Sequence, residues 1–317
     1  MLKKTVEIQS PRKAYGEALV ELGKNNPNLV VLDADLAAST QTNMFKKEFP
    51  ERFFDIGISE QDMMTTAAGL SLTGKTVFAS TFAMFASARC LDQIRNSICY
   101  QNANVKIVAT HGGITVGEDG ASHQALEDIS YMRSIPNMTV IVPADYTEVK
   151  KAVYYAATHK GPFYIRVARA NLQTVFDEDE YKFKINETVT IKEGKDLVII
   201  ANGEELLEVI KCADMLEKEG ISASVIHAPV VKPLSFDIIK KTASIPLIVT
   251  VENHSIIGGL GSAVCEMISE NSPKKVVRIG TNDEFGQSGE QRALMDFYGL
   301  TGEKLAQRIL SEFKKGK

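Results

Sequence analysis

The feature that most limits the folds open to this chain is a regular alternation of short apolar runs with helical segments. In the first half we expect a strand in each of six places and a helix after most of them. Strands that alternate with helices favour a mostly parallel, doubly wound sheet with helices on both faces. The expected strands are 29–33, 53–56, 76–79, 105–110, 139–142 and 163–167.

An acidic stretch at 177–181 interrupts this alternation, and a second series of strand and helix signals follows it. A chain of 317 residues is long enough for two α/β domains. We therefore predict two doubly wound domains, residues 1–176 and 191–317, joined by a linker at 177–190. The strands expected in the second domain are 197–201, 222–227, 247–251 and 276–279.

Composition excludes several classes of protein. The net charge of −4 argues against a nucleic-acid binder. Every apolar run is far shorter than the roughly 18 residues that span a bilayer, and the N-terminus lacks the apolar region of a signal peptide. The four cysteines have neither CxxC nor metal-ligand spacing, which is typical of the reducing cytoplasm. We expect a cytoplasmic protein without membrane or nucleic-acid partners.

Glu60 is the first candidate catalytic residue. Ser59 followed by Asp62 indicates a capped helix start, and Met63 and Met64 begin its buried face. Glu60 would lie in the first helical turn, where the helix dipole favours its anion by roughly 0.3–1 kcal/mol. Burial would favour the neutral acid instead and suit a general acid/base. From this segment alone, an ordinary first-turn carboxylate remains the alternative.

An aromatic pair follows the strand at 76–79. Phe82 and Phe85 are three residues apart, so they would share one face of a long helix expected at 82–100. Ligands of α/β sheets bind where a strand ends and a helix begins, and two aromatic rings there could hold a flat heterocycle. Ordinary core packing remains the alternative.

The loop at 110–124 carries polar groups in a glycine-rich context. Its glycines allow a ligand to approach the backbone closely, and His111, Asp119 and His123 lie among them. The two histidines are not at a recognised metal-ligand spacing, so we predict no metal site on this chain. A pocket for a hydroxylated or phosphorylated substrate is favoured.

Three further residues could complete such a pocket. Arg12 begins the first helix, Ser39 follows the strand at 29–33, and Arg169 follows the strand at 163–167. Arginine is the natural bidentate partner of phosphate. Each of these residues alone could equally be an ordinary surface residue.

Taken in order, these motifs resemble the transketolase family of thiamine diphosphate enzymes. The resemblance covers nearly the whole chain and implies a pyrimidine-binding domain followed by a transketolase C-terminal domain. It implies transfer of a two-carbon ketol unit from a ketose phosphate to an aldose phosphate, as in the pentose phosphate pathway. The motifs are Gly57-Ile58-Ser59-Glu60-Gln61, Ser80-Thr81-Phe82 and the run from Gly117 to Gln124.

The resemblance also implies cofactor contacts. Glu60 resembles the glutamate that hydrogen-bonds to N1′ of the aminopyrimidine ring and promotes the imino tautomer that removes the C2 proton of the thiazolium. Phe82 and Phe85 resemble the aromatic residues that line the pyrimidine. Ala88 stands where relatives carry another aromatic residue, which implies a looser pocket. Asp35 resembles a cofactor-side residue near the subunit seam.

Substrate contacts are implied in the same way. His111 is similar to the histidine that contacts the terminal hydroxyl and carbonyl region of the donor. Asp119 resembles the residue that reads the configuration of the C2 hydroxyl, and His123 resembles a histidine close to the cofactor. The residues that match the phosphate-binding positions are Arg12, Ser39 and Arg169.

Half of the expected cofactor site is missing from this sequence. The family holds the diphosphate and its divalent metal, Mg²⁺ or Ca²⁺, through a Gly-Asp-Gly motif with a downstream Asn, and no such motif occurs here. The resemblance therefore implies the C-terminal subunit of a split enzyme. A separate N-terminal subunit would hold diphosphate and metal, in a two-fold α2β2 heterotetramer with active sites between subunits.

Four alternatives stay open. A 1-deoxyxylulose-5-phosphate synthase-like chain would carry an Arg-Ala-Gly type sequence in place of Thr110-His111-Gly112-Gly113, so His111 favours ketol transfer. The glutamate and aromatic segments of a 2-oxo acid dehydrogenase E1 β subunit differ from those here. A transketolase for a sulfosugar or a modified pentose fits the same motifs. A silent scaffold subunit would have lost Glu60, His111, Asp119 and His123.

Overall fold

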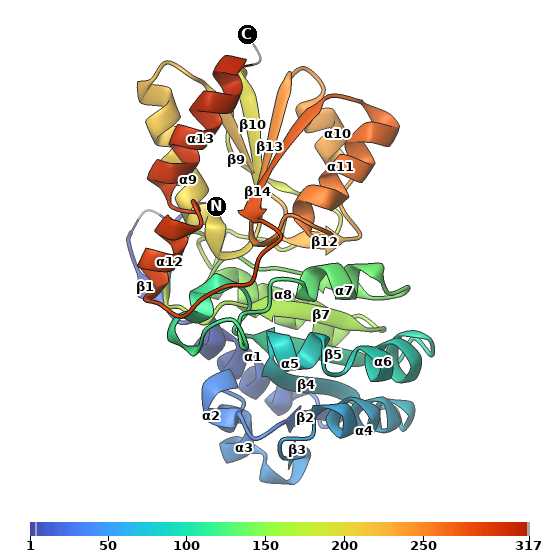
Figure 1. Cartoon of the computed structure of the whole chain (residues 1–317). Coiled ribbons are helices and arrows are strands. Elements are labelled where there is room, and N and C mark those ends of the chain that lie inside the picture. The colour runs from blue at the N-terminus through green and yellow to red at the C-terminus, as the bar shows by residue number, and fades with distance from the viewer. Residues whose placement is uncertain (4, 316–317) are drawn as a thin grey trace.

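A central sheet lies in each half of the chain. The computed structural model describes residues 1–3 and 5–315. Figure 1 shows two α/β lobes, the N-terminal one in blue to green below and the C-terminal one in yellow to red above. Two α/β folds with mostly parallel sheets were predicted, and this is confirmed. Within the described residues, no helix combines the length and apolarity that crossing a membrane requires.

The sheet of the lower lobe is parallel except at one edge. Its order is β12-β6-β7-β5-β4-β2-β3, and only β12 runs antiparallel to its neighbour. Strands covered on both faces are buried along their whole length and mostly apolar, as β2 and β5 are here. Because β12 comes from the second half of the chain, both halves contribute to this sheet. The bounds are β2 Leu29–Asp33, β3 Phe53–Asp55, β4 Thr76–Phe82, β5 Val105–Thr110, β6 Thr139–Ile141, β7 Phe163–Val167 and β12 Val230–Lys232.

Helices cover both faces of this sheet. One core packs beneath α1, α3 and α8, and the other beneath α4, α5, η2 and α7. The helix α1 begins in the expected way, because Ser10 Oγ accepts a hydrogen bond from the amide of Lys13 and Pro11 occupies the first turn. The bounds are α1 Pro11–Asn25, α2 Ala37–Thr40, α3 Asn43–Glu48, η1 Pro50–Arg52, α4 Glu60–Leu72, α5 Ala83–Ser87, α6 Leu91–Gln93, η2 Ile94–Cys99, η3 Ile114–Asp119, α7 Asp128–Ser134 and α8 Tyr146–Thr158.

The upper lobe repeats this layered arrangement around a sheet of order β14-β13-β10-β11-β9, in which only β9 pairs antiparallel. Helices α9 and α13 cover one face, and α10 and α11 cover the other. The bounds are β9 Val189–Lys192, β10 Leu197–Ala201, η4 Gly203–Glu205, α9 Leu206–Lys218, β11 Ala223–His227, α10 Asp237–Thr242, β13 Leu247–Ser255, α11 Leu260–Asn271, β14 Lys275–Thr281, α12 Gln291–Phe297 and α13 Gly302–Lys315. A short pair, β1 Ile8–Gln9 with β8 Leu172–Gln173, is separate from both sheets.

The long helix expected at 82–100 is wrong. Strand β4 continues to Phe82, because this residue still pairs with Thr110 of β5. Helical turns follow in three short pieces, with a turn at 88–90 and a π-helix at η2. Phe82 and Phe85 therefore do not lie on one helix, although their rings still stack with centroids 6.0 Å apart.

The start of α4 also differs from its prediction. Ser59 precedes the helix, but its side chain makes no capping hydrogen bond. Asp55 instead holds the segment that leads into α4. Its Oδ1 accepts hydrogen bonds from the amides of Gly57, at 3.1 Å, and Asp35, at 3.0 Å. Gly57 has φ of 76°, a left-handed conformation that suits glycine.

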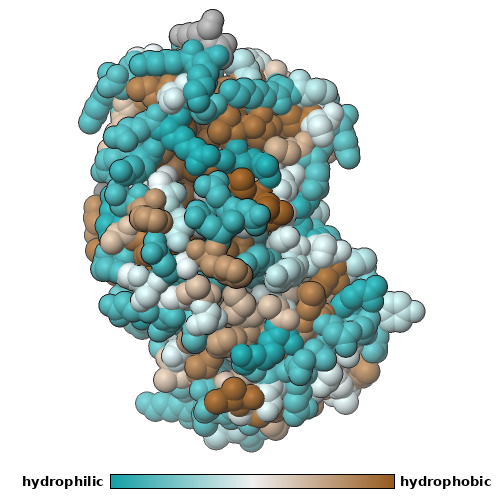
Figure 2. Space-filling view, in the orientation of Figure 1, coloured by the Kyte–Doolittle hydropathy of each residue, from teal (hydrophilic) through white to brown (hydrophobic). Residues whose placement is uncertain are grey.

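A buried polar cluster connects the two lobes. Glu148 of α8 accepts a hydrogen bond from Tyr181, and its Oε2 lies 2.7 Å from Nε2 of His227 on β11. The ring of Tyr181 stacks on Phe176 with centroids 4.1 Å apart. Figure 2 shows that hydrophilic residues cover most of the face drawn there, and that hydrophobic residues reach the surface in separate patches on both lobes. The exact domain and linker boundaries stay a prediction.

Candidate active site

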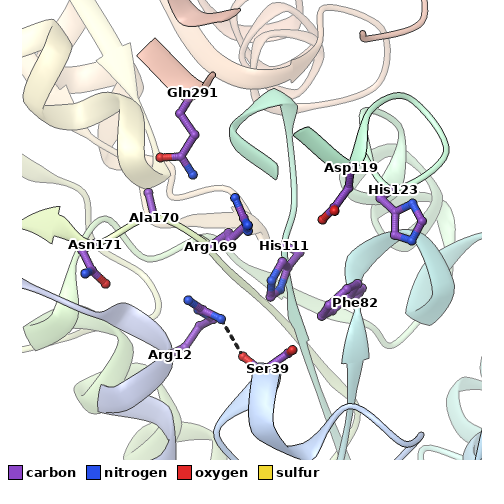
Figure 3. A pocket seen from close by; sticks show the side chains of 10 residues that line it. All are labelled: Arg12, Ser39, Phe82, His111, Asp119, His123, Arg169, Ala170, Asn171 and Gln291. Carbon is purple, nitrogen blue, oxygen red and sulfur yellow. Dashed lines mark hydrogen bonds between the residues drawn. The ribbon is translucent and has the colours of Figure 1, made fainter. Parts of the chain in front are cut away.

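A cavity of about 510 Å³ opens where the strands of the lower sheet end. Phe82 ends β4, His111 follows β5 and Arg169 follows β7, so the site lies at the carboxyl edge of a parallel sheet. Seven residues predicted from the sequence meet there: Arg12, Ser39, Phe82, His111, Asp119, His123 and Arg169. Figure 3 shows these side chains around one space, with Ala170, Asn171 and Gln291 completing the wall.

One end of the cavity is strongly basic. Arg12 and Arg169 both face it, and neither forms an ion pair with a carboxylate of the described residues. Nη1 of Arg12 donates a hydrogen bond of 2.9 Å to the Ser39 carbonyl, whereas its buried Nε has no partner in that part of the chain. Burial and the nearby Arg169 lower the pKa of Arg12. Two guanidinium groups without a counter-charge can bind an anion.

Asp33, which sequence reasoning missed, holds the turn that carries Ser39. Its carboxylate accepts hydrogen bonds from the Leu36 amide at 2.7 Å and from the hydroxyls of Thr40 and Thr42 at 2.7 and 2.8 Å. Burial raises the pKa of Asp33 to about 6. The sequence shows only a single Asp at the end of a strand. It does not indicate these hydrogen bonds, because the turn at 36–42 brings the partners of Asp33 to it only in the folded chain.

His111 is held as a neutral imidazole. Its backbone is left-handed, with φ of 62°, and its Nδ1 shares a hydrogen bond of 2.7 Å with the Thr110 hydroxyl. The ring stacks on Phe82 with centroids 3.8 Å apart. Burial, reinforced by the charges of Arg12 and Arg169, lowers the pKa of His111 from 6.5 to about 3. The imidazole can therefore hydrogen-bond to a hydroxyl or carbonyl group without carrying charge.

This pKa predicts a pH-dependent stability term. Unfolded His111 binds a proton below its ordinary pKa of 6.5 and the folded residue does not, so its contribution is lost as pH falls. Relative to His111→Asn, we expect the wild-type chain to lose about 2 kcal/mol of unfolding free energy between roughly pH 7.5 and pH 5. Asparagine tolerates the left-handed backbone, which makes it the matched replacement.

Urea unfolding of both proteins at each pH measures this difference. Burial raises the pKa of Asp33 and Asp145 to about 6, so these carboxyls stabilise the fold as pH falls. Both carboxyl groups are present in the wild-type chain and in the variant, so their contributions to the unfolding free energy cancel when the two proteins are compared. A difference that stays constant with pH would show that folded His111 titrates normally.

The aromatic wall extends from the cavity towards Glu60. The Phe82 ring stacks on Phe85 at an interplanar angle of 17°, and the His123 ring meets Phe85 edge-on at 5.3 Å. Nδ1 of His123 lies 3.0 Å from the Ser122 hydroxyl. These rings form an aromatic surface that leads from the cavity to Phe85, which in turn contacts Arg89 beside the start of α4.

Glu60 is buried, with 3% of its surface exposed, and it is paired with Arg89. Nη1 of Arg89 lies 2.8 and 2.9 Å from the two carboxylate oxygens, and its guanidinium lies 4.4 Å from the centre of the Phe85 ring. Sequence reasoning missed Arg89 because it placed the residue in an uninterrupted helix. The turn at 88–90 instead carries this side chain back to Glu60.

This arrangement fits the pyrimidine half of thiamine diphosphate. An aminopyrimidine needs a ring face to stack on and, at its edge, a buried carboxyl group that can share a proton with its ring nitrogen. The planar, nitrogen-bearing guanidinium of Arg89 already uses Phe85 as the face and Glu60 as the carboxyl group. The residues present can therefore hold such a ring in place of the guanidinium.

Two predicted features lie outside this geometry. Asp35 does not line the cavity; it is exposed on a turn, where its amide bonds to Asp55. Its role at a subunit seam stays a prediction. Among residues 1–3 and 5–315, no group of three or more His, Cys, Asp or Glu side chains is arranged to hold a metal ion. That a partner subunit holds the metal also stays a prediction.

Sequence reasoning missed Asn171 and Gln291, which line the same cavity. Asn171 follows Arg169 by two residues, so its neighbourhood could have indicated it. Gln291 is the first residue of α12 in the upper lobe, 122 positions after Arg169 in the chain. No local pattern in the sequence connects it to the other lining residues.

Comparison with known proteins agrees with this fold. Residues 9–174 match the family model of the transketolase pyrimidine-binding domain, and residues 186–305 match that of the transketolase C-terminal domain. The fold and these two matches define a pyrimidine-binding domain followed by a transketolase C-terminal domain. The chain belongs to the transketolase family and is the C-terminal section of a split transketolase.

Three similar proteins illustrate this relationship. A Methanocaldococcus jannaschii protein, provisionally named a transketolase C-terminal section, is 53% identical over 99% of this chain and 100% of its own length. The 6-deoxy-6-sulfo-D-fructose transketolase subunit SqwH of Clostridium sp. strain MSTE9 is 37% identical over 93% of this chain and 91% of its own length. A solved split-gene transketolase, described as an inactive beta4 tetramer, is 48% identical, with a TM-score of 0.90 and coverage of 96% and 99% of the two chains.

Proposed function

We propose that this chain transfers a two-carbon ketol unit from a ketose phosphate to an aldose phosphate, together with a separate N-terminal subunit and thiamine diphosphate. The observation that carries the proposal is the composition of the cavity. Its basic end holds Arg12 and Arg169, and its other end holds hydroxyl-reading groups such as His111 and Asp119 beside an aromatic wall. A phosphorylated polyol matches both ends.

Each group on this chain has a separate task in the proposed reaction. The Arg12 and Arg169 side chains bind the sugar phosphate and set the distance of the carbonyl from the aromatic wall. Neutral His111 forms a hydrogen bond near the carbonyl group of the donor sugar. Asp119 accepts a hydrogen bond from a hydroxyl group of that sugar. Glu60 hydrogen-bonds to the pyrimidine nitrogen and holds the proton that activates the ring. Bound thiamine diphosphate supplies the electron sink for the two-carbon fragment.

The split arrangement is supported by what this chain lacks. Glu60 and Phe85 can hold a pyrimidine ring, but no Gly-Asp-Gly motif for diphosphate and metal occurs in the sequence. We infer that the N-terminal subunit binds the diphosphate through Mg²⁺ or Ca²⁺ and that the active site lies between chains. A two-fold α2β2 heterotetramer would form two such sites.

A donor with another anionic end is the second candidate. A sulfonate resembles a phosphate in carrying several acceptor oxygens, and Arg12 and Arg169 would bind either group. The Clostridium relative is named for a sulfosugar, and it matches most of this chain. Ketose phosphates and sulfoketoses therefore belong in the same substrate panel.

Reconstitution tests the proposed function. We expect the purified chain to bind thiamine diphosphate weakly or not at all by calorimetry, and to have no ketol-transfer activity. Adding an N-terminal subunit that carries the Gly-Asp-Gly and Asn signature should produce metal-dependent transfer between a ketose phosphate and an aldose phosphate. Tight, metal-dependent cofactor binding by this chain alone would contradict the split site. An assembled but inactive pair, across the whole donor panel, would contradict ketol transfer.

A further inference from the structure

The glycine-rich loop that carries His111, Asp119 and His123 is held from the other lobe. Oδ1 of Asn253, on β13, accepts a hydrogen bond of 2.9 Å from the Ile114 amide. Nε2 of Gln291 and Oγ of Ser288 donate hydrogen bonds of 2.6 Å each to the Thr115 and Glu118 carbonyls. Three side chains of the C-terminal half thus fix the backbone along η3.

Two further contacts extend this attachment. Oε1 of Glu204, at η4, accepts a hydrogen bond of 2.6 Å from the Thr115 hydroxyl. Nε2 of Gln124, at the end of the loop, donates one of 3.0 Å to the Gln287 carbonyl. The loop is therefore bonded to the upper lobe on both sides of Asp119.

The glycines of the loop make this close approach possible. Gly113 is left-handed, with φ of 81°, and a Cβ atom there would lie 2.5 Å from Oδ1 of Asn253. Gly117, with φ of 82°, divides η3, and a Cβ there would lie 3.3 Å from the Gly289 carbonyl. A backbone this rich in left-handed glycine is entropically costly to order. The contacts from the upper lobe offset that cost.

Gln291 does more than hold the loop, because its side chain also lines the cavity. Glu290 caps α12 by accepting from the Ala293 amide at 3.0 Å, which places Gln291 at the start of the helix. Figure 3 shows its amide near Arg169, on the side of the cavity opposite Arg12. A polar group from the C-terminal half thus lies at the basic end of the site.

We propose that the C-terminal domain contributes functional residues to the site that binds the donor sugar. Asn253 and Ser288 are positioning residues that hold the loop bearing His111 and Asp119. Gln291 is a specificity-determining residue that reads the anionic end of the donor beside Arg169. The donor assignment rests on the proposed function, whereas the positioning of the loop does not.

Hydrogen exchange on the full isolated chain tests the positioning role without any activity. In Asn253→Ala we expect the Ile114 amide, which loses its acceptor, to exchange about tenfold faster, as one lost hydrogen bond of about 1.4 kcal/mol predicts. Ser288→Ala should speed exchange at 118–123. Gln287→Ala is the matched control, since only its backbone carbonyl contacts the loop. Core amides of β5 should keep their rates in all three. Unchanged exchange in the loop would overturn the positioning role.

Kinetics of the reconstituted enzyme test Gln291. In Gln291→Ala we expect the KM of a phosphorylated ketose to rise about tenfold, as the loss of one hydrogen bond to an anion predicts. Because this variant also loses the hydrogen bond to the Thr115 carbonyl, kcat should fall to the same extent for donors with and without phosphate. The KM of the same ketose without phosphate should stay constant. Asn253→Ala should instead lower kcat and kcat/KM for both donors. Equal KM effects of Gln291→Ala on both donors would overturn its specificity role. An inactive wild-type pair would contradict the proposed function alone and leave the exchange result valid.

Discussion

Replacing Glu60 with glutamine is expected to lower turnover of the reconstituted enzyme by roughly 10²–10⁴-fold, the usual contribution of a positioned acid/base. Glutamine keeps the size of the side chain but cannot hold the proton that we propose Glu60 shares with the pyrimidine. Because the residue is buried at the first turn of α4, the neutral amide should leave the fold and the assembly intact. Steady-state turnover and size-exclusion chromatography measure the two effects.

Arg89→Gln is the matched control for this experiment. It removes the other half of the ion pair, and Arg89 is 45% exposed. We expect a much smaller loss of turnover than in Glu60→Gln, and tighter cofactor binding by the assembled enzyme, because the guanidinium no longer competes for Glu60 and Phe85. Equal losses in both variants would show that the ion pair, and not proton transfer, gives Glu60 its importance.

Removing the two arginines of the cavity should weaken donor binding strongly. A hydrogen bond to a charged group contributes about 1.5–3 kcal/mol, so Arg12→Ala and Arg169→Ala should each raise the KM of a phosphorylated ketose roughly 10–100-fold. The effect on kcat should be small, because the phosphate is held equally in the ground and transition states. Initial rates over a range of donor concentrations separate the two parameters.

Lys13→Ala is the matched control for the two arginine variants, because it also removes one positive charge. Lys13 is adjacent to Arg12 in sequence, but its ammonium pairs with Glu17 on the surface of α1. This variant should leave the donor KM unchanged. If all three substitutions raise the KM to a similar extent, or if a donor without phosphate is affected as strongly, then Arg12 and Arg169 do not form a phosphate site.

Much of the site could be predicted because its residues lie in contiguous motifs at strand ends. Parallel strands bring their carboxyl ends to one edge of a sheet, so Ser39, Phe82, His111 and Arg169 had to lie near one another once the strand order was set. The helix at 82–100 was predicted wrongly for a related reason. Pairing of Phe82 with Thr110 extends β4, and such pairing outweighs local helical spacing.

The sequence by itself determined two α/β folds, the transketolase resemblance and the main residues of the cavity, because periodicity and motif spacing are local properties. Only the tertiary structure decided how these groups are held. The turn at 88–90 brings Arg89 to Glu60, and docking of the upper lobe brings Asn253 and Gln291 to the glycine-rich loop that carries His111, Asp119 and His123. These contacts join residues on separate elements, and their geometry depends on how the elements pack, which no local pattern encodes.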